Sequence, residues 1–199
     1  MRSFSIFCLL LVSVFTAEAQ ASWRLVKEKN GIKVFMSSVE TSKFKSIRVQ
    51  TVFSGTIQKL MNILADINKL PQWVYRAKSA NLLKQPGPYE FIYYIETIVP
   101  WPMSNRDAIL HLTMMPDTVH HELKINAFSE PNFIPKKSGL VRVPFSKGTW
   151  YVTETANKIN IDYIFQVDPG GSIPAWLVNM LADKGPYESF QRLRAKLAQ

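Results

Sequence analysis

The segment from Ile161 to Leu181 constrains the fold of this chain most, because it joins an alternating strand to an apolar helix through a tight turn. Hydrophobic and more polar residues alternate from Ile161 to Val167, which is the pattern of a strand with one buried face. In the D-P-G-G turn that follows, proline donates no backbone hydrogen bond and glycine adopts positive φ at little cost. The predicted hinge residues are Gly170, Gly171 and Pro174.

The helix predicted from Pro174 onward has an apolar stripe along one side. At the helical repeat of about 100° per residue, its large hydrophobic residues fall on one face. These residues are Trp176, Met180, Tyr187, Phe190 and Leu197. Gly185 and Pro186 are expected to kink or briefly break this helix. The stripe must cover something apolar, so the helix is expected to lie over an apolar part of the domain.

The first 21 residues have the pattern of a secretory signal peptide. Arg2 precedes an apolar run from Ile6 to Phe15, and Ala17-Glu18-Ala19 fits the pattern at which such signals are cleaved. The run of about ten residues is shorter than the roughly 20 that a membrane-spanning helix needs. We therefore expect residues 1–21 to direct export, with the mature chain in the periplasm or secreted.

The remaining residues, 22–199, are expected to form a single domain. The chain is 47% hydrophobic and has no internal repeat or linker-like tract, which argues against disorder. Cys8, the only cysteine, lies in the predicted signal, so disulfides and thiolate chemistry are excluded from the mature chain. His120 and His121 are adjacent on a predicted strand and point to opposite faces. We expect a monomer with no metal and no cofactor.

The chain is basic, with a formal net charge of +9, and much of the excess lies between Arg24 and Arg48. Nucleic acid is not expected as a partner of an exported chain. One interpretation is transient attraction to an anionic membrane surface, at about 1 kcal/mol for each basic residue near the lipid headgroups. The other is a solvated basic face that aids solubility. Both remain open at this point.

Most of the chain predicts strands in series. The elements expected first are a short amphipathic helix over Trp23–Asn30, strands over Ile32–Ser37 and Phe44–Phe53, a helix capped by Thr56, and a short helix over Ile67–Tyr75. The strands expected next are Asn81–Lys84, Glu90–Val99, Ala108–Met115, Val119–Phe128, Leu140–Phe145, Gly148–Thr155 and Asn160–Val167. Strands in series imply an antiparallel sheet. Because Glu90–Val99 is apolar on both faces, a second apolar space is expected beside the core.

Two segments together resemble the StAR-related lipid transfer, or START, domain family. The segment Pro100–Asp107, PWPMSNRD, is similar to the family's P-x-S-x-R-D segment. The D-P-G-G-x-I-P-x-W-L-V-N segment from Asp168 is similar to the turn and helix with which these domains end. The resemblance implies an α+β, helix-grip (START/Bet v 1-like) fold, with a long curved antiparallel sheet wrapped around a C-terminal helix. It also implies an internal apolar cavity.

In function, the resemblance implies non-enzymatic binding and transfer of a lipid or other hydrophobic small molecule. The helix from Pro174 onward is the expected gate of the cavity. Sterol-carrying members have a further arginine six positions after the arginine of the R-D pair, where this chain has Leu112. A sterol is therefore less favoured as the ligand.

The candidate ligand-binding residues combine apolar surface with a few polar atoms. They are Trp73, Tyr93, Ile95, Glu96, Arg106, Leu110, Leu112, Trp150, Tyr163, Phe165, Trp176 and Met180. For the aromatic residues, the alternative is ordinary core packing. Glu96 is expected either in the cavity or at a wet edge of the sheet. Arg106 is expected either to hold a ligand headgroup, with Asp107 or Glu96 as counter-charge, or to fix the turn into the next strand.

Two other classes of function remain open. The chain has no G-x-S-x-G, H-E-x-x-H or phosphate-binding loop motif. An enzyme of the cyclase or hydrolase type would need Glu96, Arg106, Asp107, His111 or a tyrosine to converge in the cavity. An interaction module would instead have a filled core. A continuous apolar tunnel supports carriage, converging polar groups support catalysis, and a filled core supports interaction.

Overall fold

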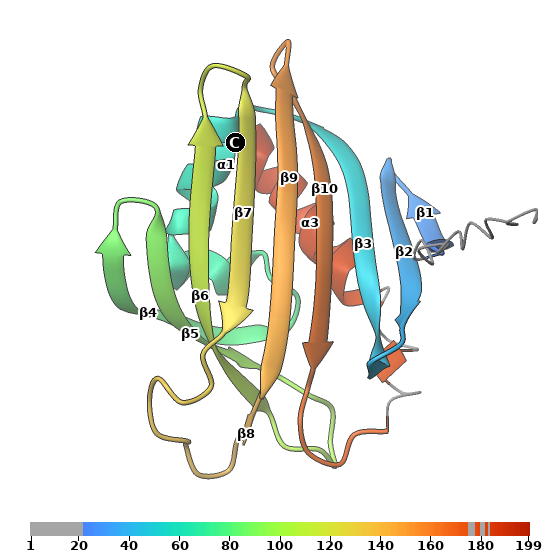
Figure 1. Cartoon of the computed structure of the whole chain (residues 1–199), viewed down its shortest axis with the longest axis vertical. Helices are drawn as coiled ribbons and strands as arrows, with labels where there is room; N and C mark the ends of the chain where they lie inside the picture. Colours follow the sequence, from blue (N-terminus) through green and yellow to red (C-terminus); the bar gives the residue numbers. More distant parts are fainter. Residues whose placement is uncertain (1–21, 175–177, 180–181, 183) are drawn as a thin grey trace, which may run out of the picture.

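A long antiparallel sheet curves around the C-terminal helix (Figure 1). The computed structural model describes residues 22–174, 178–179, 182 and 184–199, so the predicted signal peptide and the candidate ligand residues Trp176 and Met180 lie outside the described residues. Among the described residues, the sheet has ten strands in the order β1-β2-β3-β10-β9-β7-β6-β5-β4, with the short β8 paired to β6. This confirms the predicted α+β architecture.

The strands are β1 (Arg24–Lys29), β2 (Ile32–Val39), β3 (Ser42–Ser54), β4 (Ala77–Gly87), β5 (Glu90–Thr97), β6 (Arg106–Asp117), β7 (Glu122–Ser129), β8 (Val141–Arg142), β9 (Phe145–Thr155) and β10 (Lys158–Asp168). The helical elements are α1 (Ile57–Ala65), the 3-10 helix η1 (Ile67–Gln72) and α3 (Lys184–Ala198). In the described part of the chain, neighbouring strands pair antiparallel, except that β8 runs parallel to its partner β6.

The start of α1 is fixed by two side chains, one local and one distant. Thr56 Oγ1 accepts a hydrogen bond from Lys59 N at 3.2 Å, which confirms the predicted cap. A carboxylate oxygen of Glu154 on β9 accepts a second hydrogen bond from Ile57 N at 2.7 Å. These bonds satisfy amides at the start of α1 and tie the helix to the sheet.

The core lies between the concave face of the sheet and α3. The buried residues of α3 are Tyr187, Phe190, Leu193 and Leu197, three of which belong to the predicted stripe. They pack with the inward-facing residues of the central strands, among them Ile125 and Ile161. Fully burying one such side chain stabilises the fold by about 1.5–3 kcal/mol. The apolar stripe therefore covers the sheet, as its pattern predicted.

The helix predicted over Trp23–Asn30 is wrong, because this segment forms β1 and pairs with β2. The reason is the turn at Asn30 and Gly31, whose φ angles are 54° and 71°. Two successive residues with positive φ are the signature of a tight hairpin, and Asn-Gly is the sequence that most readily forms it. The hairpin turn thus overrides the weak helical pattern before it.

Other predicted boundaries shift where turns intervene. The strand predicted from Val119 begins at Glu122, since His121 has a left-handed backbone with φ 55°. The strand predicted over Leu140–Phe145 shrinks to β8. The helix was predicted to be interrupted at Gly185 and Pro186. Ala182, before them, lies in a turn, but Gly185 and Pro186 themselves occupy the first turn of α3. Proline is tolerated there because no backbone donor is needed.

None of the helices in the described part of the chain is long and apolar enough to cross a membrane.

Candidate functional site

A cavity of about 430 Å³ lies between the concave face of the sheet and α3. Strands β5, β6 and β10 contribute much of its wall, namely Tyr93, Ile95, Leu110, Leu112, Tyr163 and Phe165. Trp73, Trp150 and Phe190 complete the aromatic part of the lining. The volume falls within the range of roughly 300–1,000 Å³ that is usual for small-molecule sites. The core is therefore not completely filled. The cavity is on the core face of β5, whereas Ile92 and Tyr94 on the other face pack with Ile109 and Ile134 in a small separate cluster. The second apolar space predicted beside the core is therefore wrong.

A second space of about 350 Å³ adjoins the first at the lower end of the sheet. The two spaces share the lining residues Tyr75, Arg76, Phe165, Val167, Gly185 and Pro186. The second space lies between the β5–β6 loop (residues 98–105), which contributes Pro100 and Met103, and the segment after β10, which contributes Pro169 and Ile173. We call this second space the mouth of the cavity.

Aromatic rings stack along one wall of the cavity. Trp150 and Tyr163 are directly opposite in the β9–β10 register, and their ring centroids are 4.4 Å apart. Phe165 also stacks on Tyr163, and their ring centroids are 4.9 Å apart. Phe190 of α3 lies 5.2 Å from Trp150. The stack fixes the Tyr163 ring in place and joins the helix to the sheet.

The interior of the cavity offers neutral polar groups. Burial raises the pKa of Tyr93 and of Tyr163, so both phenols remain protonated at physiological pH. Trp73 Nε1 is buried and has no hydrogen-bond partner among the described residues. Of the residues that the structure describes, no aspartate or glutamate lines the cavity or its mouth. The site can therefore surround an apolar molecule and offer it a few hydrogen bonds.

Glu96 is not in the cavity, so its assignment as a ligand-binding residue is wrong. Tyr93 and Ile95 face the cavity, and the alternation of β5 therefore places Glu96 on the opposite face of the sheet. Its carboxylate accepts hydrogen bonds from Asn105 Nδ2 at 2.9 Å and from Lys78 Nζ at 3.0 Å. The hydrogen bond from Asn105, followed by that from Lys78, lowers the pKa of Glu96.

Asp107 is paired with Arg142, not with Arg106. Two hydrogen bonds of 2.9 Å join the carboxylate of Asp107 to the guanidinium of Arg142, and both side chains are almost completely buried. Arg142 also donates to the carbonyls of Pro131, Ile134 and Pro135 in the β7–β8 loop. The predicted pairing of Arg106 with Asp107 or Glu96 is therefore wrong, because each carboxylate has a different cationic partner.

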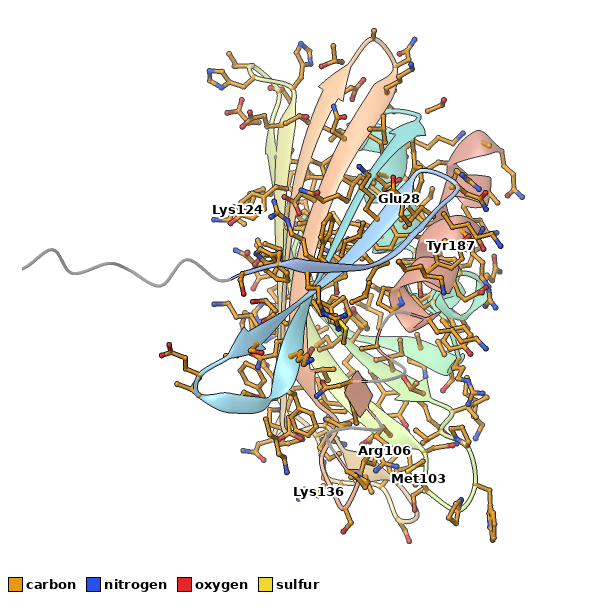
Figure 2. The ribbon with its side chains drawn as sticks, turned by 90° about the vertical axis from the view of Figure 1, so that its right-hand side faces the viewer. Glu28, Met103, Arg106, Lys124, Lys136 and Tyr187 are labelled. Atoms are coloured by element: carbon orange, nitrogen blue, oxygen red, sulfur yellow. The ribbon has the colours of Figure 1, made fainter. Side chains whose placement is uncertain are left out.

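Arg106 lies on the cavity side of β6 but beyond the described lining. It is buried, and it lies near Met103 at the lower end of the sheet (Figure 2). Its guanidinium donates to the carbonyl of Ser104 and, at 3.5 Å, to that of Gly170, while burial lowers its pKa. These bonds connect the β5–β6 loop to the turn after β10. They agree with the expectation that Arg106 fixes the turn into its strand.

The turn after β10 requires glycine at the predicted hinge. Gly170 and Gly171 have φ angles of 67° and 66°, in the left-handed region that other residues rarely adopt. A Cβ atom on Gly170 would lie 3.0 Å from the carbonyl oxygen of Arg142 and from Cδ of Pro144. Val178 N donates to Pro174 O at 3.3 Å, and residues 178–179 are helical. The D-P-G-G segment thus redirects the chain from the sheet toward the helix.

Most of the predicted ligand-binding residues that the structure describes line the cavity. Those brought together there are Trp73, Tyr93, Ile95, Leu110, Leu112, Trp150, Tyr163 and Phe165. Sequence reasoning missed Tyr75, Arg76 and Gly148. A glycine inside a strand often marks a close approach, which was a usable signal for Gly148. Nothing in the local sequence marks Arg76, whose φ of 59° arises from the turn before β4.

Comparison with known proteins assigns the fold to a family. The sequence pattern of the START domain matches residues 13–199. The chain belongs to the START domain family. The START chain is 30% identical to an uncharacterised protein of Pseudomonas aeruginosa over 202 residues, with 98% of each chain covered. It is also 28% identical over 172 residues to the phosphatidylcholine transfer protein of Mus musculus, covering 83% of this chain and 78% of the relative.

Solved structures agree with this START assignment. The crystal structure of a STAR-related lipid transfer protein from Xanthomonas axonopodis superposes with a TM-score of 0.83 at 31% identity, covering 89% of this chain and 99% of that one. Human StAR-related lipid transfer protein 5 has a TM-score of 0.77 at 18% identity, covering 92% and 89% of the two chains, which is a likeness of fold alone. The helix-grip fold is therefore confirmed.

Proposed function

We propose that this START chain binds one lipid or other hydrophobic small molecule in the cavity and carries it without changing it chemically. The observation that carries the proposal is the apolar, aromatic-lined space between the sheet and α3. Lipid transfer proteins among the relatives support the same function. A carrier must also release its ligand, and the small difference between burial in a membrane and burial in a protein cavity suits this.

The positions of the charged side chains favour carriage over catalysis. Glu96 and Asp107 are on the face of the sheet opposite the cavity, and each bonds to a basic side chain. His111 is on that face as well, between carboxylate oxygens of Glu90 and Glu130 at 2.6 and 2.7 Å. Among the described residues, these carboxylates and His111 do not converge on the cavity, where the titratable groups beside the arginine at the entrance are the protonated phenols of tyrosines.

For the gate, we propose the β5–β6 loop together with the segment that follows Gly170 and Gly171. The mouth of the cavity lies between these two parts, and the hinge glycines stand at the start of the second. If these two segments move apart, the mouth widens and the paired strands stay undisturbed. The gating role of the helix from Pro174 onward belongs to the same proposal.

We further propose that the β5–β6 loop contacts the membrane surface transiently. Trp101 is 91% exposed in this loop, and Ile98 of the same loop is 43% exposed. Tryptophan is favoured at the boundary between lipid and water, and the net charge of +9 attracts anionic headgroups. In the same proposal, residues 1–21 direct export to the periplasm or beyond, and residues 22–199 act as a monomer.

The test is lipid capture by a variant whose cavity is filled. Leu110→Trp places a larger side chain in the cavity wall, and Val52→Trp, at a 54% exposed position, is the matched control. Purified proteins are analysed by native mass spectrometry and by transfer of a fluorescent lipid between vesicles. We expect the wild type and Val52→Trp to bind and transfer lipid, and Leu110→Trp to lose both at unchanged far-UV circular dichroism. Equal transfer by all three proteins would refute a role for the cavity.

A further inference from the structure

Basic side chains gather around Tyr75 where the cavity meets its mouth. Arg76 Nε donates to Tyr75 Oη at 3.3 Å, and the guanidinium carbon of Arg76 lies 5.6 Å from the Tyr75 ring centroid. Arg192 of α3 lies over the same ring at 5.9 Å. The pKa of Tyr75 is lowered, first by the hydrogen bond from Arg76 and also by Lys184. Tyr75 is therefore the centre of a cationic cluster.

The cluster is held rigidly at the entrance. Tyr75 N donates to Ser189 Oγ at 2.9 Å, which fixes this turn to α3. Arg76 has a left-handed backbone, with φ 59°, and its carbonyl accepts a hydrogen bond from Ile98 N at 2.9 Å. A non-glycine residue in this conformation is uncommon and is held there by its surroundings. The position of Arg76 is thus set by the fold.

The charges that line the entrance are all of one sign among the described residues. Arg76 lines both the cavity and its mouth, and Lys184 lines the mouth. In the described part of the chain, neither side chain forms an ion pair with a carboxylate. Glu188 is the one described acid near Tyr75, where it opposes the lowering of the tyrosine's pKa. The entrance therefore has positive charge that the described acids do not pair.

We propose that Arg76 and Lys184 bind the anionic headgroup, a phosphate or a carboxylate, of the lipid whose chain occupies the cavity. This inference rests on the proposed function. A guanidinium presents a planar set of donors that matches phosphate and carboxylate oxygens, and the lysine adds a second charge. The cavity interior behind them is neutral and apolar, so the ligand is a lipid with its charge at the mouth and its chain inside. A phosphocholine headgroup gains less from these two cations, because its quaternary ammonium offsets the charge of its phosphate.

Binding is tested without membranes, so that the headgroup of the ligand is separated from the surface of a bilayer. The probes are lysophosphatidic acid and lysophosphatidylcholine with the same acyl chain, each below its aggregation concentration, in isothermal titration calorimetry. The variant is Arg76→Asn with Lys184→Gln, because asparagine tolerates the left-handed conformation. The control is Lys124→Gln with Lys147→Gln on the outer face of the sheet, where Lys124 is seen in Figure 2.

We expect the wild type and the control to bind lysophosphatidic acid about tenfold or more tightly than lysophosphatidylcholine. The double variant should lose this preference, because its affinity for lysophosphatidic acid falls more than its affinity for lysophosphatidylcholine. Equal affinity of the wild type for the two lipids would overturn the headgroup assignment and leave the proposed function standing. If the wild type binds neither lysolipid, the headgroup assignment fails, whereas the proposed function is decided by native mass spectrometry and lipid transfer with the Leu110→Trp variant.

A second experiment, with vesicles, distinguishes binding of a single anionic lipid from contact with an anionic membrane surface. Sedimentation with phosphatidylglycerol vesicles reports contact with a membrane surface. Should the double variant lose vesicle binding but keep the wild-type preference between the two lysolipids, the two cations serve the surface and the headgroup assignment is wrong. If the double variant loses the lysolipid preference while its vesicle binding is unchanged, the headgroup assignment is supported.

Discussion

Trp150 and Tyr163 stack face to face across β9 and β10, and the space that Tyr163 occupies exists because residue 148 has no side chain. A Cβ atom on Gly148 would lie 3.1 Å from Cε2 and 3.2 Å from Oη of Tyr163. These distances are too short for the ring to stay where it is. The glycine thus determines where the tyrosine hydroxyl stands in the cavity.

Gly148→Ala should therefore destabilise the protein by about 1–3 kcal/mol, the usual cost of overpacking, because the Tyr163 ring must shift within its stack. Gly87→Ala is the control, since a Cβ atom there would meet its nearest neighbour at 3.8 Å and needs no rearrangement. Urea denaturation measures both changes. A Gly148→Ala variant as stable as the control would show that the stack yields easily.

Asp107→Ala should cost about 3–5 kcal/mol, because it leaves the buried guanidinium of Arg142 without its counter-charge. The exposed pair of Lys69 and Asp66 provides the comparison, and Asp66→Ala should change stability by less than about 1 kcal/mol. Chemical denaturation of both variants is the measurement. The double variant Asp107→Leu/Arg142→Met should recover part of the loss, since it leaves no unpaired charge.

The pH dependence of stability should contain a contribution from Glu96. Its pKa in the folded state is below the ordinary value of 4.5, so the folded state favours the ionised carboxylate. That contribution is fully present above pH 4.5 and is lost as pH falls through the lowered pKa. The difference in Tm between the wild type and Glu96→Gln should be largest at neutral pH and shrink in acid. A difference that grows below pH 4.5 would reverse the assigned sign.

Arg106→Gln should loosen the lower end of the molecule, because it removes the bonds that connect Ser104 and Gly170 through one side chain. We expect faster hydrogen exchange at residues 98–105 and 169–173, with the amides of β9 and β10 unchanged. Lys136→Gln is the control, since Lys136 is exposed at the same end of the molecule (Figure 2). Unchanged exchange in the two segments would mean that other contacts hold them together.

Trp101→Ala should weaken vesicle binding about tenfold while leaving the affinity for a soluble lysolipid unchanged, because Trp101 is outside the described cavity lining. Val119→Ala, at a position 79% exposed on the β6–β7 turn at the other end of the sheet, should have no effect on either. Vesicle sedimentation and calorimetry measure the two quantities. A parallel loss of both would assign Trp101 to ligand binding instead of surface contact.

The sheet could be predicted from local patterns, since alternation and turn residues are properties of neighbouring positions, whereas the cavity was implied by the family resemblance. The apolar residues of Glu90–Val99 correctly indicated that both faces of this strand are buried, but the cavity is on the core face and the other face packs against Ile109 and Ile134. The same alternation contradicts the choice of both Ile95 and Glu96 as cavity residues. Adjacent residues of a strand face opposite sides, so that error could have been avoided from the sequence alone.

The charged pairs could not be predicted in this way. Asp107 finds its partner 35 positions away in β8, and no local pattern links the two residues. Arg76 owes its place at the entrance to a turn, whose neighbouring residue Tyr75 bonds to Ser189 of α3, so it depends on the whole fold. The β1–β2 hairpin is different, because Asn30-Gly31 is a strong turn signal that outweighs the amphipathic spacing of the residues before it.

The pairing of β3 with β10 also sets a limit on how fast this protein folds. These neighbouring strands come from opposite ends of the domain, and the bond between Arg48 and Asp162 spans 114 positions in the chain (Figure 1). The entropy of closing so long a loop must be lost before the contacts across it form. High contact order of this kind is associated with folding times of milliseconds to seconds. The wall of the cavity is therefore completed only after β10 has left the ribosome, so a growing chain cannot enclose a ligand early.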